Sequence, residues 1–354
     1  MALPFLKSRV KKRDQVVAID LGSRNTKAVH LQRRGDGFSL VRYTIQDAPI
    51  YEKNISPDLL SEHLRAIVQA LDSKSKSVTL SLGVADSILR NTELPQMTIS
   101  EMRLMLKYNT KNYLQQDLPD FAFDCHIVPP KEMHKPEISG KGPAKYKVWV
   151  GGAKNQLLND LQTAAKSAGL TIDQVVMSIL GPVNAFEAYQ PEVFSKEIVA
   201  LVDIGFKNST INILYEGDLA LSRVVGIGGD KLTTGLAESL GISYAEAEGI
   251  KIGMPQEVES SLQPLLSPLG RELRASLDFF EHQHDKAVSQ VFVSGGAARS
   301  EFILEVLQTE MMVPCKGWNP TSFLNIALPP QQMGELELVA QQLAVALGAA
   351  VAEF

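Results

Sequence analysis

The stretch Val16–Val29, VVAIDLGSRNTKAV, is an apolar run that breaks into a short polar turn and then becomes apolar again. This pattern predicts two strands joined by a tight turn. Turn amides, hydroxyls and an ammonium can hold phosphate oxygens, and a carboxylate can hold a magnesium-bound water. The stretch offers all of these groups, in Asp20, Gly22, Ser23, Thr26 and Lys27. Taken alone, an Asp-x-Gly turn also joins the strands of many ordinary hairpins.

A second stretch, Leu201–Leu214, LVDIGFKNSTINIL, repeats this arrangement. Its Asp203, Gly205 and Asn208 stand at one common offset from their counterparts in the first stretch. Each copy is followed by another glycine-containing turn and another apolar run, so both predict three strands joined by two turns. Because a two-fold internal repeat rarely arises by chance, the repeat favours a pair of phosphate-binding turns over two unrelated hairpins.

The composition is that of an ordinary soluble globular protein, and 354 residues are enough for two or more domains. The net charge is −5 without a broad basic excess, so nothing favours a nucleic-acid partner. Two cysteines, Cys125 and Cys315, are too few for a disulfide framework and favour a reduced, cytosolic setting. No run of about 18 uninterrupted apolar residues occurs, so no membrane span is predicted.

Residues 1–14 are predicted to be a solvated basic tail. Their basic residues follow a very short apolar segment, which is the wrong order and length for a secretory signal. A weak contact with a membrane surface is an alternative for this tail.

After the tail, hydrophobic periodicity predicts an α/β layer: a three-stranded meander over residues 15–43, a helix over residues 57–73 and a strand over residues 78–84. A separate module then begins near Asp86.

In this module Thr98 and Glu101 form a capping box that starts a helix. Alternating strands at residues 121–128 and 146–150 follow, and the polar stretch between them predicts an exposed loop.

Two more glycine clusters follow the repeat. Gly226–Asp230 precedes a helix, and a glycine cluster at a helix N-terminus can hold an anion through free amides and the helix dipole. The turn at Ser294, Gly295 and Gly296 ends a buried strand, where backbone can approach a flat ligand closely. A long helix is predicted over residues 264–284, and an apolar helix over residues 336–351 is predicted to pack in the core.

Two Asp-x-Gly turns, a Gly-Gly-Asp helix start and a Ser-Gly-Gly turn, in this order, resemble the actin-like ATPase superfamily. The resemblance implies an α/β protein with an actin-like fold, in which two RNase H-like domains clasp ATP and Mg²⁺ and a small α+β subdomain is inserted in the first domain. It implies these divisions: the tail at 1–14, the first domain at 15–85 and 169–198, the inserted subdomain at 86–168, the second domain at 199–335 with nucleotide-covering helices at about 230–288, and a C-terminal helix at 336–354 that packs back on the first domain.

The resemblance also assigns the nucleotide-binding residues. They are Asp20, Gly22, Ser23, Lys27, Asp203, Gly205, Ser209, Gly228, Gly229, Glu248, Lys251, Gly295, Gly296 and Ala297. In this assignment Asp20 and Asp203 hold Mg²⁺ through water, and Asp203 is the catalytic candidate that orients the attacking water. Lys27 faces the β-phosphate, while Glu248 and Lys251 contact ribose and adenine.

The position of the insertion narrows the resemblance, because FtsA and the PilM family carry their extra subdomain inside the first domain. Three short sequence motifs are similar to those of the PilM family of type IV pilus assembly: Glu93-Leu94-Pro95, Gly241-Ile242-Ser243-Tyr244 with Ala247-Glu248, and Leu343 to Gly348. FtsA continues into a linker and a membrane-targeting helix, whereas this sequence stops after a core-like helix, which favours the PilM family.

The PilM family implies a cytoplasmic, ATP-binding scaffold at the inner face of the cytoplasmic membrane. Such a scaffold binds the N-terminal segment of a PilN-like bitopic inner-membrane protein and links the pilus assembly ATPases to the envelope complex. A related secretion or DNA-uptake system fits as well. The alternatives are an FtsA-like polymerising cell-division protein and a small-molecule kinase of the same superfamily.

Three residues depart from the family pattern. Phe206 and Lys207 replace small residues after the second Asp-x-Gly, and Arg24 is unusual in the first turn. Asn184 and Glu187 lie where a water-positioning residue is expected, but neither has the matching context. The sequence therefore predicts nucleotide binding with at most slow hydrolysis.

Overall fold

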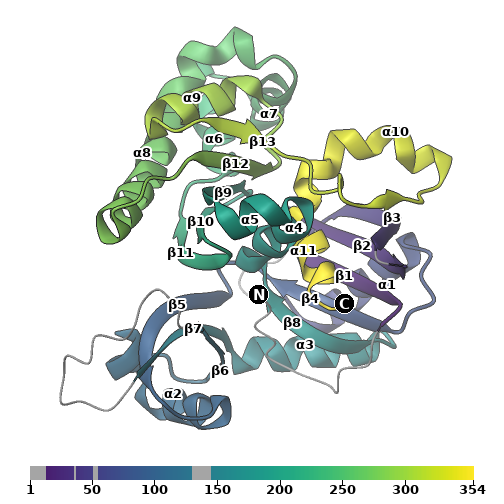
Figure 1. Ribbon diagram of the computed structural model, residues 1–354. Helices are drawn as coiled ribbons and strands as arrows, with labels where there is room; N and C mark the ends of the chain where they lie inside the picture. The colour runs from purple at the N-terminus through teal and green to yellow at the C-terminus, as the bar shows by residue number, and fades with distance from the viewer. Residues whose placement is uncertain (1–12, 36, 51–54, 130–144) are drawn as a thin grey trace.

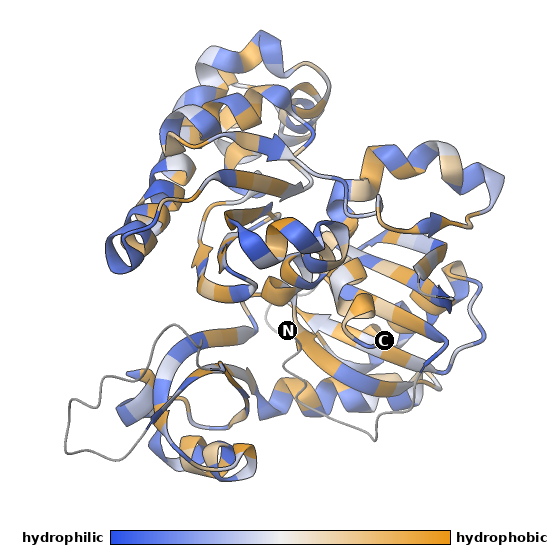
Figure 2. Cartoon of the chain, in the orientation of Figure 1, coloured by the Kyte–Doolittle hydropathy of each residue, from blue (hydrophilic) through white to orange (hydrophobic). Residues whose placement is uncertain are grey.

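The computed structural model describes residues 13–35, 37–50, 55–129 and 145–354 (Figure 1). The predicted tail, except for its last two residues, and the predicted loop at 129–145, except for its two end residues, lie outside the described residues. The described residues form two large sheets and one small one. Apolar residues gather on their strands and on the inward sides of their helices (Figure 2).

The first large sheet has the strand order β14-β3-β2-β1-β4-β8. Its strands are β1 (Gln15–Leu21), β2 (Asn25–Arg34), β3 (Gly37–Asp47), β4 (Ser77–Leu82), β8 (Thr171–Met177) and β14 (Asn325–Ile326). The helices α1 (Pro57–Ala70) and α3 (Asn155–Ser167) pack on one face. Leu64 and Leu161 meet Ile19 there in one apolar cluster, as the helical spacing of the leucines predicts.

The second large sheet has the order β11-β10-β9-β12-β13. Its strands are β9 (Ile198–Ile204), β10 (Ser209–Tyr215), β11 (Asp218–Val225), β12 (Gln290–Gly295) and β13 (Cys315–Gly317). The helices α8 (Glu259–His284) and α9 (Glu301–Met311) pack against it through residues such as Leu273 and Leu307. α8 begins before the predicted residue 264, so Pro264 and Pro268 lie inside the helix.

The two sheets confirm the internal repeat. The order β11-β10-β9-β12-β13 matches β3-β2-β1-β4-β8 strand for strand. The register matches too, because Asp20 pairs with Lys27 across β1 and β2, and Asp203 pairs with Thr210 across β9 and β10. The pattern Asp-x-Gly therefore occupies the same turn in both halves.

The inserted module is a three-stranded sheet of order β5-β7-β6, with one helix on it. Its elements are β5 (Ser87–Pro95), α2 (Ile99–Leu114), β6 (Phe121–Ile127) and β7 (Lys145–Lys154). The predicted capping box at Thr98 and Glu101 starts α2. The module projects from the body beside β11 (Figure 1), and the indole N–H of Trp149 donates to the carbonyl of Leu219 at 3.0 Å.

Two short helices join the halves. α4 (Gly181–Tyr189) follows the 3₁₀ turn Ser178–Leu180, and α5 (Pro191–Lys196) comes next in the chain. α4 packs against α11 (Ala344–Val351). Both α4 and α11 lie in the interior, where Ala346 and Leu347 meet β1 and β2. They cross at two glycines, since a Cβ on Gly348 would lie 1.7 Å from the carbonyl oxygen of Gly181.

The C-terminal segment differs from its prediction. Instead of one helix at 336–351, it forms α10 (Pro330–Val339), a 3₁₀ turn (Ala340–Leu343) and α11. β14 pairs with β3, so the chain returns to the first sheet before the predicted boundary at 336. By length and composition alone, Pro330–Val351 could cross a membrane, but 56% of its apolar window is buried inside the protein.

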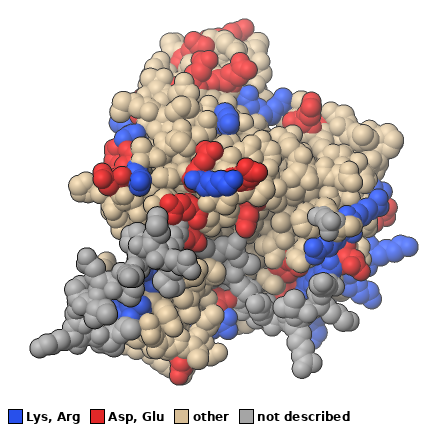
Figure 3. Space-filling view, in the orientation of Figure 1, with Lys and Arg blue, Asp and Glu red and all other residues tan. Residues whose placement is uncertain are grey.

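Charges on the face shown in Figure 3 are of mixed sign. Among the described residues on this face, acidic side chains cluster at the top, and basic side chains at the right edge have acidic ones among them.

A buried carboxyl near the C-terminus makes stability depend on pH. The side chain of Glu353 is only 2% exposed, and its Oε2 lies 3.2 Å from Arg13, which also pairs with Asp173 at 2.7 Å. Burial raises the pKa of Glu353 from 4.5 to about 7, with Asp173 adding to the rise and Arg13 opposing it. The folded chain therefore holds this proton more tightly than the unfolded chain does, and stability falls as pH rises from 4.5 to about 7.

Glu353→Gln should remove this dependence, which amounts to on the order of 3 kcal/mol. Urea unfolding at several pH values across this window measures it. Glu337→Gln, at an exposed position of α10, is the matched control and should follow the wild-type profile. Parallel profiles for wild type and Glu353→Gln would show that another group titrates.

Candidate functional site

Two tight turns form the centre of the candidate site. The first turn is residues 22–25, between β1 and β2, and the second turn is residues 205–208, between β9 and β10. A Cβ on Gly22 would lie 2.5 Å from the carbonyl oxygen of Asn25, and one on Gly205 would lie 2.7 Å from that of Asn208. Only glycine therefore fits either turn without a backbone shift.

Asp20 lies at the end of β1, directly before the first turn. Its side chain is nearly buried, and one carboxylate oxygen lies 3.5 Å from the ammonium of Lys27. Burial raises the pKa of Asp20, and the charge and hydrogen bond of Lys27 oppose the rise. A buried carboxylate with a single ammonium neighbour is a suitable place for a cation or its bound water.

Asp203 occupies the equivalent place before the second turn. The hydroxyl of Ser294 donates to Asp203 Oδ1 at 2.8 Å, because β12 pairs with β9 in the register that sets these residues side by side. Burial raises the pKa of Asp203; Ser294 and Lys27 lower it, and the charge of Asp20 raises it further. Lys27 and Asp20 thus act on Asp203 across the two halves, and the structure brings these three predicted residues together.

The helix α6 (Gly229–Leu240) begins against the second turn. The amide of Gly229 donates to the carbonyl of Gly205 at 2.9 Å, and the amide of Asp230 donates to that of Phe206 at 2.8 Å. A Cβ on Gly228 would lie 2.3 Å from the Phe206 oxygen. These glycines therefore permit a close backbone approach, and two of the amides expected to hold an anion are already used by the turn.

The helix α7 (Tyr244–Gly253) contributes a charged pair. Lys251 is buried and its ammonium lies 2.6 Å from Glu248 Oε2, 2.5 Å from Thr233 Oγ1 and 3.3 Å from the carbonyl of Gly229. Burial would raise the pKa of Glu248, but hydrogen bonds from Lys251 and Thr233 and the charges of Lys251 and Arg24 outweigh it, so this pKa is lowered. Burial lowers the pKa of Lys251, with Glu248 opposing the change.

The turn after β12 completes the group. Gly295 has φ +95° and pairs with Ile204, and a Cβ there would lie 2.3 Å from the Ile204 carbonyl oxygen. No atom lies within 4 Å of the position that a Cβ on Gly296 would take. Gly296 and Ala297 therefore stand in an open turn beside the second turn.

Two predicted hydroxyls have different surroundings. Ser23 is exposed in the first turn, where it can meet a ligand. Ser209 is fully buried and its hydroxyl donates to the carbonyl of Ile227 at 2.6 Å, so the structure does not bring it to the site. Asn184 is buried in α4, and Glu187 is exposed there.

The residues that sequence reasoning missed are the partners of the charged groups. The sequence predicts Ser294 only as part of a turn, whereas in the structure its hydroxyl donates to Asp203. Thr233 follows Gly229 by one helical turn, and its hydroxyl contacts the Glu248 carboxylate. Arg24 bonds Glu248 at 2.9 Å. Only the spacing of Thr233 from Gly229 could have indicated its position.

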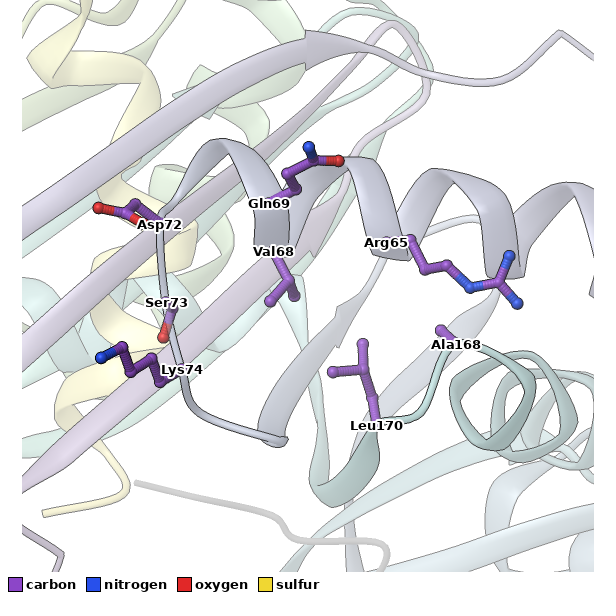
Figure 4. Close-up of a pocket in the computed structure, with 8 residues that line it drawn as sticks. All are labelled: Arg65, Val68, Gln69, Asp72, Ser73, Lys74, Ala168 and Leu170. Carbon is purple, nitrogen blue, oxygen red and sulfur yellow. The ribbon is translucent and has the colours of Figure 1, made fainter.

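A separate pocket of about 320 Å³ lies on the first half, between the end of α1 and the chain that follows α3 (Figure 4). Val68 and Leu170 face one another in it, while Arg65 and Lys74 stand at opposite ends. It contains none of the residues of the two turns, so it is not part of the candidate site.

The donor set fits a magnesium nucleotide. Asp20 and Asp203 are buried carboxylates with raised pKa values, and the charge of Lys27 acts on both, so a divalent cation would relieve the cost of their burial. The open turn at Gly296 leaves room for a flat group. The chain's own residues would hold the cation's waters through Asp20 and Asp203 and the ribose through Glu248.

Comparisons with known proteins agree with this architecture. The cell division protein FtsA of Bacillus subtilis (strain 168) is 22% identical over 259 residues, which cover 66% of this chain. The chain spans 57% of the length of that curated relative.

Among solved structures, the PilM-PilN type IV pilus biogenesis complex matches with a TM-score of 0.82 and 20% identity, over 97% of this chain and 99% of the other. MreB5 of Spiroplasma citri bound to AMPPNP matches with a TM-score of 0.52 and 12% identity, over 96% of this chain and 95% of the other. These likenesses confirm the predicted actin-like fold.

The family comparison is more specific than the fold. The model of the family described as type IV pilus assembly protein PilM matches residues 18–354, from the first strand with its Asp-x-Gly turn to the helix that crosses α4. The chain therefore belongs to the PilM family of type IV pilus assembly proteins.

Proposed function

We propose that this chain is a nucleotide-braced scaffold of type IV pilus assembly that binds the N-terminal cytoplasmic segment of a PilN-like inner-membrane protein. Membership of the PilM family supports the pilus role. The solved PilM-PilN complex, which resembles this chain over nearly its whole length, supports the partner. In this proposal the chain lies at the cytoplasmic face of the inner membrane because its partner is anchored there.

The observation that carries the nucleotide part is the meeting of Asp20, Lys27 and Asp203 between the two halves. With Mg²⁺ and ATP bound, Asp20 and Asp203 would hold magnesium waters and Lys27 would contact phosphate. Mg²⁺ would neutralise phosphate charge and polarise the phosphate oxygens. Ligand groups held by both halves would brace them together, which is a structural use of ATP.

Turnover in this proposal is slow at most. Asp203 is the candidate to orient an attacking water, and its hydrogen bond to Ser294 fixes its carboxylate. Phe206 places a bulky ring in the second turn, at the position that Ser23 occupies in the first turn. We therefore infer that ATP serves binding more than catalysis.

A direct contact joins the inserted module to β11 of the second half, and can connect the module to the nucleotide site between the halves. Trp149 of β7 is buried and bonds the carbonyl of Leu219 at the start of β11, and Leu89 and Trp149 share an apolar cluster with Leu219 and Phe292. A ligand that fixes the relation of the two halves would also fix the module against β11. By linkage, ATP strengthens partner binding only as far as it prefers the partner-binding form.

Isothermal titration with a synthetic N-terminal peptide of the PilN-like protein tests this proposal. We expect the wild-type chain to bind the peptide, with Mg-ATP present, and not to bind a scrambled peptide of the same composition. Failure to bind both with and without ATP would remove the proposal.

The sequence likeness to FtsA supports one other candidate, a protein that polymerises. Sedimentation of the chain with Mg-ATP separates the two, because a scaffold of this kind stays in the supernatant.

A further inference from the structure

Arg24 connects three separate parts of the molecule. It lies in the first turn, and its Nη1 is 2.9 Å from Glu248 Oε1 on α7, 224 positions away in the sequence. Its guanidinium carbon lies 5.2 Å from the centroid of the Phe206 ring, in the second turn. A single side chain of the first half therefore contacts both the second turn and the helical part of the second half.

The two oxygens of Glu248 have different partners. Oε2 is taken by Lys251 and Thr233, which belong to the same helical part as Glu248 itself. Oε1 is the oxygen that faces the first half, and Arg24 occupies it. Glu248 is 16% exposed and Arg24 41% exposed, so the pair is partly shielded from water and salt.

The internal repeat shows that this contact is not needed to form the turns. At the common offset, Arg24 corresponds to Lys207 and Phe206 corresponds to Ser23. Both turns have the same register and the same glycine constraint, yet only one arginine and one aromatic ring are present, and they face each other. Because neither turn needs this pair in order to fold, we infer that Arg24 and Phe206 act on how the two halves are positioned relative to each other.

We propose that Arg24 ties the two halves together when no nucleotide is bound, and that a nucleotide must displace it from Glu248. The second part rests on the proposed function, because it takes Glu248 as the carboxylate that receives the ribose hydroxyls. The two halves are then held together, in what we call the closed form, before ATP arrives. The nucleotide replaces the contact of Glu248 with Arg24 by a contact with the ribose. Phe206 keeps the guanidinium near the turns after the exchange, through a cation–π contact.

The nucleotide-free chain tests the tie directly. An ion pair of this exposure together with a cation–π contact predicts that Arg24→Ala raises the open-to-closed ratio about tenfold. Small-angle scattering should show a larger radius of gyration, and hydrogen exchange of the amides in residues 22–25 and in α7 should quicken to a similar extent. Arg24→Lys should fall between, because lysine keeps the charge but lacks the planar group.

Three controls define the result. Arg34→Ala removes the same charge from an exposed position of β2 and should leave both readouts at wild-type values. Glu248→Gln should open the nucleotide-free chain as Arg24→Ala does. The double variant, Arg24→Ala with Glu248→Gln, should be little more open than either single variant, because the two residues share one interaction. Raising the salt concentration should open the wild-type chain and leave Arg24→Ala unchanged.

The outcomes separate this inference from the proposed function. If Arg24→Ala changes neither the radius of gyration nor the hydrogen exchange of the nucleotide-free chain, Arg24 does not hold the halves together. This conclusion does not depend on which ligands the chain binds. If Arg24→Ala opens the nucleotide-free chain but the wild-type chain binds no Mg-ATP, the proposed nucleotide role is wrong, as is displacement of Arg24 by a nucleotide. The role of Arg24 in holding the halves together is then still supported. If Arg24→Ala stays open at saturating Mg-ATP while the wild type closes, displacement by the nucleotide is wrong.

Discussion

Gly348→Ala should lower the free energy of unfolding by at least about 3 kcal/mol. The added Cβ would lie 1.7 Å from the carbonyl oxygen of Gly181 and 2.5 Å from its carbonyl carbon. These are backbone atoms of α4, so the clash cannot be relieved by turning a side chain. The whole crossing of α4 and α11 has to widen, and Ala346 and Leu347 then lose their packing against β1 and β2.

Urea unfolding followed by circular dichroism measures this loss. Gly334→Ala is the matched control, because Gly334 is an exposed helical residue of α10 and its added Cβ meets nothing within 4 Å. That variant should be neutral or more stable by about 0.5 kcal/mol, since alanine favours a helix. If Gly348→Ala were as stable as Gly334→Ala, the close crossing would not exist in solution.

Asp20→Ala should weaken the binding of Mg-ATP by at least about 100-fold, which corresponds to about 2.7 kcal/mol. It removes one of the two buried carboxylates that would hold the magnesium waters. It also leaves the ammonium of Lys27 without the carboxylate that lies 3.5 Å away, although the free ammonium can then meet phosphate more strongly. The loss of magnesium binding should dominate, because in the proposed function ATP binds as its magnesium complex.

Calorimetric titration with and without Mg²⁺ separates these effects. The variant should lose most of the affinity that magnesium adds and little of the affinity for ATP alone. Asp117→Ala, at an exposed position of the inserted module, is the control and should bind Mg-ATP as the wild type does. Equal Mg-ATP affinity in Asp20→Ala and wild type would contradict the assigned role of Asp20.

The repeat made much of the fold predictable. Asp20 and Asp203 carry the same local pattern, and their strands form sheets of the same order and register. Glycine positions were informative because Gly22 and Gly205 are required by turns that are local in sequence. Local patterns of this kind need no knowledge of distant contacts.

Contacts between distant residues were not predictable. The pairing of Arg24 with Glu248 depends on how the halves face each other, and no local pattern carries that information. Ser209 was assigned to the nucleotide because it follows the second turn, but the strand alternation turns its hydroxyl inward to Ile227. The C-terminal segment is predicted as one helix interrupted by the polar pair Gln341 and Gln342, and the structure places there the 3₁₀ turn that lets α11 enter the core.

In the proposed function, nucleotide binding and partner binding are linked through the relative position of the two halves. The most direct test is the dissociation constant of the PilN-like peptide, measured on the wild-type chain with and without saturating Mg-ATP. We predict about twofold tighter binding with Mg-ATP, a small factor because Arg24 already keeps part of the nucleotide-free chain closed, and by reciprocity the same factor in the affinity for ATP when the peptide is saturating. Identical peptide affinities in the two conditions, on a chain that binds both ligands, would contradict the claim.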